Sequence, residues 1–141
     1  MITKTAVLPC SIERAFELFT AHASEWWPPE RRHTRDPASQ IRMLASGRFW
    51  ERDSQGREVE LGRVRTWEPP NRIVLDWYPG TDADHPTQAV VSFAAEGTAT
   101  RITIEHRPLP ESDDLWGDRV SRYVVSWDLV LGALASHVAR S

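Results

Sequence analysis

The chain has 141 residues and a formal net charge of −3, and its apolar content of 40% and charged content of 26% are typical of globular proteins. This length allows one domain with one core, and the net negative charge excludes a global attraction to nucleic acid or to anionic membranes. The single cysteine, Cys10, excludes an intrachain disulfide, and no Cys/His spacing typical of a metal site occurs. We therefore predict one domain over residues 1–141, without a metal site or a cofactor.

The N-terminus carries no recognisable targeting signal. The first ten residues, MITKTAVLPC, lack an apolar stretch long enough for a signal peptide, and no segment is long and apolar enough to span a bilayer. An unpaired cysteine is in keeping with a reducing compartment. We therefore expect a cytoplasmic protein with no membrane span.

The N-terminal segment has the pattern of a strand followed by a helix. Residues 2–8 are rich in β-branched side chains and are followed by a proline, which is typical of a strand. Ser11 has the side chain of an N-cap, and apolar residues then recur at helical spacing: Ile12, Ala15, Phe16 and Phe19. A helix therefore begins near Ile12, and the Pro28–Pro29 pair ends any continuation of it.

Between residues 39 and 107 the apolar period changes to two, which is the side-chain period of a strand. Six strands are predicted, at residues 40–45, 48–52, 58–67, 72–78, 87–95 and 100–107. The segments RDSQGRE and AEGTAT supply hairpin turns between consecutive strands. Strands connected in this way form an antiparallel sheet.

The C-terminal part begins with the segment RPLPESDDLWG, which contains two prolines and is predicted to be a loop. After it an apolar stripe repeats every three or four residues: Val120, Val124, Trp127, Leu131, Leu134 and Val138. The stripe predicts one helix of about five turns. An antiparallel sheet with helices on one face is an α+β arrangement, and such a sheet can curve around the last helix and leave a cavity.

Several motifs resemble those of one family. The segment SGRFWERDSQGREVELGRVRTWEPPNRIVLDW, residues 46–77, resembles the core signature of the activator-of-heat-shock-protein-90-ATPase homologues, which belong to the START-like or SRPBCC superfamily. The segments IERAFELFT, WWP, GTATRITIEH and SWDLVLGALASHV match in order. The chain departs from the family pattern at Ser46, where a second glycine is common, and at Ser126, where a glycine commonly precedes the tryptophan.

The resemblance implies a helix-grip fold, in which a curved antiparallel sheet wraps around the C-terminal helix and encloses a cavity. Superfamily members bind lipids, hormones, polyketides and other apolar molecules, and some cyclise or dehydrate polyketides. The eukaryotic namesake stimulates a chaperone ATPase and carries an additional domain.

Strand alternation predicts which side chains face such a cavity. In most of the predicted strands, one face carries the apolar side chains and is assigned to the interior. The predicted inward-facing residues include Phe49, Glu51, Trp77, Phe93, Ile104 and His106. Alternation within residues 58–67 is ambiguous, and no face is assigned there.

Glu51 and His106 are the polar side chains on these inner faces. Burial of a polar group without a partner costs about 1–3 kcal/mol, so each must have a purpose or a partner. One hypothesis is that they orient the polar end of a ligand, with His106 as a candidate proton carrier, which makes both candidate catalytic residues. The alternative is that they satisfy each other, a backbone group or a buried water.

The chain contains seven tryptophans, and their packing raises the same choice between core and ligand site. Trp26 and Trp27 are consecutive, so one ring can lie in the core while the other faces a cavity. Trp127 lies in the middle of the apolar stripe of the last helix, one turn after Tyr123. The predicted ligand-binding residues are Trp26, Trp27, Phe49, Trp77, Phe93, Ile104, Tyr123 and Trp127.

The favoured function is the binding of a hydrophobic or amphipathic small molecule. No nucleophile–base pair and no paired carboxylates can be placed on inner faces, which favours a binding protein over an enzyme. A polyketide cyclase- or dehydratase-like enzyme and a chaperone-interacting module are the alternatives. The basic run ERRHTR is interpreted as a solvated loop without nucleic-acid binding, and a homodimer through Trp50 or Trp67 is a further hypothesis.

Overall fold

The computed structural model describes residues 1–140, which form one antiparallel sheet and the helices that pack against it. The seven strands are β1 (Ile2–Leu8), β2 (Gln40–Met43), β3 (Arg48–Arg52), β4 (Glu58–Glu68), β5 (Arg72–Trp77), β6 (Thr87–Glu96) and β7 (Ala99–Pro108). Their order in the sheet is β1-β7-β6-β5-β4-β3-β2. All the predicted strands are present, and their ends differ from the prediction by at most two residues.

The helices are α1 (Ile12–Thr20) and α2 (Asp113–Arg140), with 3₁₀ turns at Ala23–Glu25, Pro29–Arg31 and Pro110–Ser112. The predicted N-cap of α1 is confirmed, because the Ser11 side chain accepts a hydrogen bond from the backbone N–H of Arg14 at 3.2 Å.

Helix α2 is longer than the sequence pattern predicted. It begins at Asp113 and has 28 residues, so the loop predicted over RPLPESDDLWG is wrong in its second half. Asp113 and Asp114 lie in the first turn, where negative charge interacts favourably with the free N–H groups of the helix. Gly117 is tolerated inside the helix because it lies on an exposed side that packs against nothing.

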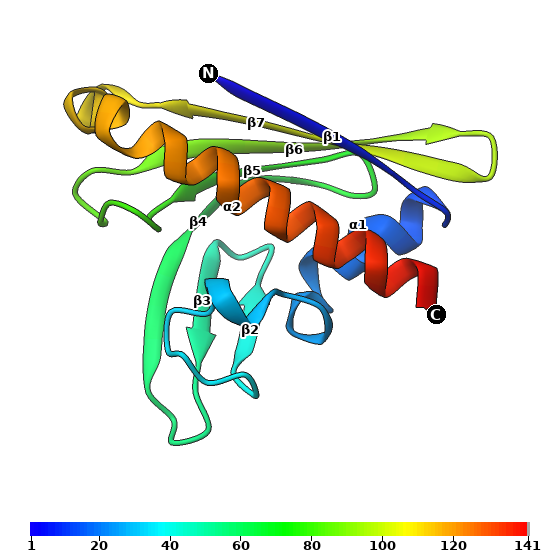
Figure 1. Cartoon of the computed structure of the whole chain (residues 1–141), viewed down its shortest axis with the longest axis horizontal. Coiled ribbons are helices and arrows are strands. Elements are labelled where there is room, and N and C mark those ends of the chain that lie inside the picture. Colours follow the sequence, from blue (N-terminus) through cyan, green and yellow to red (C-terminus); the bar gives the residue numbers. More distant parts are fainter. Residues whose placement is uncertain (141) are drawn as a thin grey trace.

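The sheet curls into a half-barrel around α2, which confirms the predicted α+β helix-grip fold. Figure 1 shows α2 lying across the sheet, while β2, β3 and the far end of β4 bend away from the other strands. The inner faces of the strands and the apolar stripe of α2 form one continuous core. Among the described residues, no helix is long and apolar enough to cross a membrane.

The ambiguous alternation in β4 has a structural cause. Its pairing shifts register twice, once opposite Phe49 and Trp50 of β3 and once at Val64–Thr66 against β5. Each irregularity moves the following side chains to the other face of the sheet and bends the strand. As a result Leu61, Gly62 and Val64 are all buried, which no single period of two can produce.

The sheet depends on a glycine at position 62, where β4 passes between its neighbours. A Cβ atom added at Gly62 would lie 2.0 Å from the carbonyl oxygen of Asp76 and 3.0 Å from the Phe49 ring. The backbone of β5 therefore leaves no room for any side chain at this position.

We predict that Gly62→Ala lowers the free energy of unfolding by about 3 kcal/mol, because strand and ring must move apart. The matched control is Gly132→Ala on the exposed side of α2, where nothing lies within 4 Å. That change should stabilise the protein by about 0.5–1 kcal/mol through helix propensity. Urea denaturation of both variants checks this, and equal stability of the two would contradict it.

Candidate functional site

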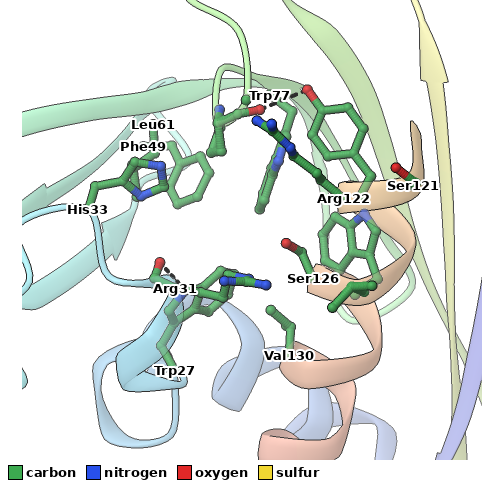
Figure 2. Close-up of a pocket in the computed structure, with 15 residues that line it drawn as sticks. Trp27, Arg31, His33, Phe49, Leu61, Trp77, Ser121, Arg122, Ser126 and Val130 are labelled. Carbon is green, nitrogen blue, oxygen red and sulfur yellow. Dashed lines mark hydrogen bonds between the residues drawn. The ribbon is translucent and has the colours of Figure 1, made fainter. Parts of the chain in front are cut away.

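A cavity of about 480 Å³ lies between the concave side of the sheet, α2 and the segment that follows α1. Figure 2 shows its walls: residues of β3 to β5 on one side, α2 on the other, and Trp27 and Arg31 between them. The lining residues are Trp27, Arg31, His33, Phe49, Leu61, Trp77, Pro79, Gly80, Ser121, Arg122, Tyr123, Val125, Ser126, Trp127 and Val130.

Trp77 at the end of β5 is the centre of the aromatic wall. Its ring centroid lies 4.9 Å from that of Trp127 on α2, 5.4 Å from that of Phe49 on β3 and 6.3 Å from that of Trp27. Offset and tilted contacts at these distances are favourable for aromatic pairs. The rings of Trp27, Phe49 and Trp127 all pack against Trp77, so the aromatic wall of the cavity is well ordered.

As predicted, one of the two consecutive tryptophans packs in the core and the other faces the cavity. The Trp26 indole N–H donates to the carbonyl of Leu18 at 2.7 Å, and its ring packs against Phe19 in the core. Trp27 instead lines the cavity, and its indole N–H donates to the carbonyl of Arg31 at 3.3 Å.

The other predicted ligand-binding residues divide in the same way. Phe49, Trp77, Tyr123 and Trp127 line the cavity. Phe93 and Ile104 face the interior of the sheet as predicted, but they pack in the core outside the cavity lining. A role for the lining residues in ligand binding stays a prediction.

Glu51 is fully buried on the inner face of β3 but does not line the cavity. Its carboxylate accepts hydrogen bonds from the backbone N–H groups of His33 and Thr34, each at 2.9 Å, and from the Thr34 hydroxyl. Its partners are therefore the backbone and a hydroxyl of the loop after Pro29–Arg31, in keeping with the alternative that a backbone group satisfies it. It fixes that loop against the sheet.

The run ERRHTR is only in part the solvated loop that its composition predicted: Glu30, His33 and Arg35 are exposed, but the other residues are not. Arg32 is buried, and its guanidinium donates to the carbonyls of Ser39 at 2.6 Å, Ser24 at 2.8 Å and Trp27 at 3.1 Å. Arg31 is half-buried and lines the cavity. The adjacent tryptophans were the signal in the sequence, because a basic run beside large apolar rings can fold over them.

His106 is also fully buried, in a chain of hydrogen bonds behind the aromatic wall. Its Nδ1 accepts from the Trp127 indole N–H at 2.9 Å, and its Nε2 lies 2.7 Å from the Thr87 hydroxyl, which donates to the carbonyl of Trp77 at 3.1 Å. Because an indole can only donate, the ring proton of the neutral His106 is on Nε2.

Burial lowers the pKa of His106 to about 3, and the positive N-terminus adds to the effect. His106 is therefore neutral at physiological pH, and it has no place in the cavity lining. The structure thus gives both ring nitrogens partners on other elements, and a role for His106 toward a ligand stays a prediction.

We predict that His106 makes the protein acid-sensitive. The unfolded chain takes up a proton at this side chain below about pH 6.5, whereas the native state resists until about pH 3. Its contribution is therefore complete above pH 6.5 and declines as the pH falls, by up to about 1.4 kcal/mol per pH unit.

The measurement is the free energy of unfolding at pH 7, 6, 5 and 4. His106→Gln should be less stable than wild type at pH 7 but show a shallower decline toward acid. Equal slopes for wild type and His106→Gln would contradict the prediction.

Sequence reasoning missed the polar members of the lining. Arg31 comes from the 3₁₀ turn Pro29–Arg31, and His33 comes from the loop that Glu51 holds. Ser121, Arg122 and Ser126 come from α2. Loss of hydration lowers the pKa of His33 below its ordinary value, an effect that the Glu51 carboxylate opposes. Helical spacing alone could have placed Ser126 near Trp127 and Val130. It could not have shown that the loop carrying His33 lies across the cavity from α2.

The residues that match a known family cover most of the chain. The family model described as activator of Hsp90 ATPase homolog 1-like protein matches residues 9–138. The chain belongs to this family. No curated protein matches it.

Several solved structures are similar to this chain in fold. CalC from Micromonospora echinospora, a self-sacrificing resistance protein, is 23% identical with a TM-score of 0.74, covering 99% of this chain and 94% of CalC. Txn09, an anthrahydroquino-gama-pyrone synthase complexed with SUM, is 26% identical with a TM-score of 0.57, covering 95% and 86%.

An HSP90 activator from Plasmodium falciparum, PFC0360w, is 15% identical with a TM-score of 0.53, covering 77% of this chain and 73% of the activator. This likeness and the likeness to CalC concern the fold alone. Within residues 1–140, no group of three or more histidine, cysteine or acidic side chains is arranged to hold a metal ion.

Proposed function

We propose that this protein binds an aromatic small molecule in the cavity between the sheet and α2. The observation that carries the proposal is the cavity itself: about 480 Å³ is the size of a small-molecule site, and its walls are mainly aromatic and aliphatic. A core that only needed to be stable would be filled, because protein interiors pack almost without voids.

The shape of the wall favours a flat ligand. Trp77, Trp127 and Phe49 present ring faces and edges that are held in place by one another. A planar aromatic molecule can stack against such rings at little cost in side-chain entropy, because they are already ordered. The likeness to Txn09, an anthrahydroquino-gama-pyrone synthase, supports the same ligand class.

An enzymatic role is the second candidate, and His33 is the observation that favours it. His33 lies at the cavity, and loss of hydration lowers the pKa of its imidazole, which favours the neutral form that a general base requires. Tyr123, whose hydroxyl donates to the carbonyl of Pro79 at 2.8 Å, is held in place in another wall of the same cavity. Loss of turnover in His33→Gln with ligand affinity unchanged would support this role.

Chaperone binding is not included in the proposal. The likeness to the Plasmodium activator extends to the fold only. Trp50 and Trp67, the residues suggested for a homodimer, already have partners within the chain: the Arg48 guanidinium lies 4.2 Å from the Trp50 ring, and Trp67 packs edge-on against Phe16 at 5.3 Å. A homodimer stays a prediction.

The proposal is tested by a substitution on α2 that places a large side chain inside the cavity. Ser126 is half-buried and lines the cavity, so Ser126→Phe should place a ring inside it without changing the fold. The neutral probe N-phenyl-1-naphthylamine should bind the wild type with a rise in its fluorescence and quenching of tryptophan emission, and Ser126→Phe should lower its affinity at least about tenfold, the effect of losing roughly 1.4 kcal/mol.

The matched control is Ser136→Phe, which makes the same change at an exposed position of α2 outside the cavity. It should bind the probe as the wild type does. Absence of probe binding to the wild type, or equal binding to Ser126→Phe, would overturn the proposal. Native mass spectrometry of the protein purified without added ligand then identifies any bound compound.

A further inference from the structure

The cavity has a charge character that its aromatic walls do not explain. Its lining contains two arginines, Arg31 and Arg122, and one histidine, but no aspartate or glutamate. The chain as a whole has more acidic than basic residues, 20 against 17, so a purely cationic lining is not a consequence of composition.

Arginines elsewhere in the chain show what this lining lacks. Arg65 on β4 is paired with Asp76 at 2.7 Å, and Arg101 on β7 is paired with Glu96 at 2.6 Å. Among residues 1–140, neither Arg31 nor Arg122 has a carboxylate partner. Both keep their positive charge at all physiological pH values, because the guanidinium is not deprotonated in proteins.

Arg31 is incompletely satisfied as well as unpaired. Its Nη1 donates to the carbonyl of Glu30 at 3.2 Å, but its Nε is buried without a hydrogen-bond partner. Among residues 1–140, one hydrogen bond within the chain therefore holds this guanidinium. Figure 2 shows the Arg31 and Arg122 side chains reaching toward the cavity from two sides, the first from the 3₁₀ turn and the second from α2.

The position of Arg31 is fixed by its neighbours in the chain. Trp27 donates to its backbone carbonyl, the next residue, Arg32, is tied to three carbonyls, and Glu51 holds the two residues after that. The Glu51 carboxylate, which contacts this loop from the sheet, is hydrogen-bonded to loop N–H groups and forms no ion pair with Arg31. A charged group held on a fixed support is preorganised for a ligand of opposite sign.

We propose that the ligand of this cavity is an aromatic anion, whose rings lie against Trp77 and Trp127 and whose acidic group is attracted by the unpaired guanidinium groups of Arg31 and Arg122. This inference rests on the proposed function and adds the ligand's charge to it. A carboxylate, sulfonate or ionised phenol supplies the required chemistry, since guanidinium groups bind such oxygens with charge-assisted hydrogen bonds.

The experiment compares two probes that differ by one charged group. N-phenyl-1-naphthylamine is neutral, and 1-anilinonaphthalene-8-sulfonate has the same rings with a sulfonate. The wild type should bind the sulfonate at least about tenfold more tightly, as expected of one charge-assisted contact. Raising the salt concentration should weaken binding of the sulfonate and leave the neutral probe unaffected.

The double variant Arg31→Gln/Arg122→Gln should lose the preference for the sulfonate while it still binds the neutral probe, which also shows that it is folded. Arg35→Gln is the matched control, because it removes a charge from an exposed position of the same loop that does not line the cavity. It should keep the preference. Arg31→Lys/Arg122→Lys should retain part of it.

The outcomes separate the two proposals. If the wild type binds both probes with equal affinity, or if the double variant keeps the preference, the inference is overturned and the small-molecule site remains. If Ser126→Phe fails to weaken either probe, or the wild type binds neither, the proposed function fails together with the inference.

Discussion

The hydrogen bond from the Trp127 indole to Nδ1 of His106 is the contact on which the architecture of the site depends. It continues from His106 to Thr87 and from Thr87 to the carbonyl of Trp77, so that α2, β7, β6 and β5 are joined by one buried chain of donors and acceptors. Both ring nitrogens of His106 have a partner in it, which is what allows a histidine to be fully buried. Apolar packing alone would hold the helix on the sheet without fixing its rotation.

The same chain determines the shape of the cavity. Trp127 and Trp77 are both members of it, and their rings form the wall against which Trp27 and Phe49 pack. The hydrogen bond to His106 fixes the Trp127 indole directly, and the Trp77 ring is ordered by its contacts with the rings of Trp127, Phe49 and Trp27. The wall of the cavity therefore depends on a polar contact in the core as well as on the packing of its rings.

Two buried charged residues, Glu51 and Arg32, hold the loop on the other side of the cavity from α2. Glu51 and Arg32 do not line the cavity, but they hold the loop that brings Arg31 and His33 to it. Buried charges are stable when hydrogen bonds satisfy them, and here each binds mainly backbone groups of the loop and its neighbours. Positive charge at the cavity is thus supported by a carboxylate that is not itself part of the lining.

The sequence determined the elements and their order, because they depend on local patterns: a period of two in β5, β6 and β7, the apolar stripe of α2, and the N-cap at Ser11. It also determined that Glu51 and His106 face inward, since alternation fixes the face of a regular strand. The start of α2 was missed because prolines and acidic residues are as common in a loop as in a first helical turn.

Only the tertiary structure decided what the inward-facing groups contact. Whether His106 binds a ligand or Trp127 depends on how α2 lies across the sheet, and whether Arg31 is solvated or lines a cavity depends on a loop held by Glu51 from a different part of the chain. Such contacts join residues far apart in the chain, and no local spacing encodes them. The chain's own pattern therefore specifies a curved sheet and a helix, and the packing between them specifies the site.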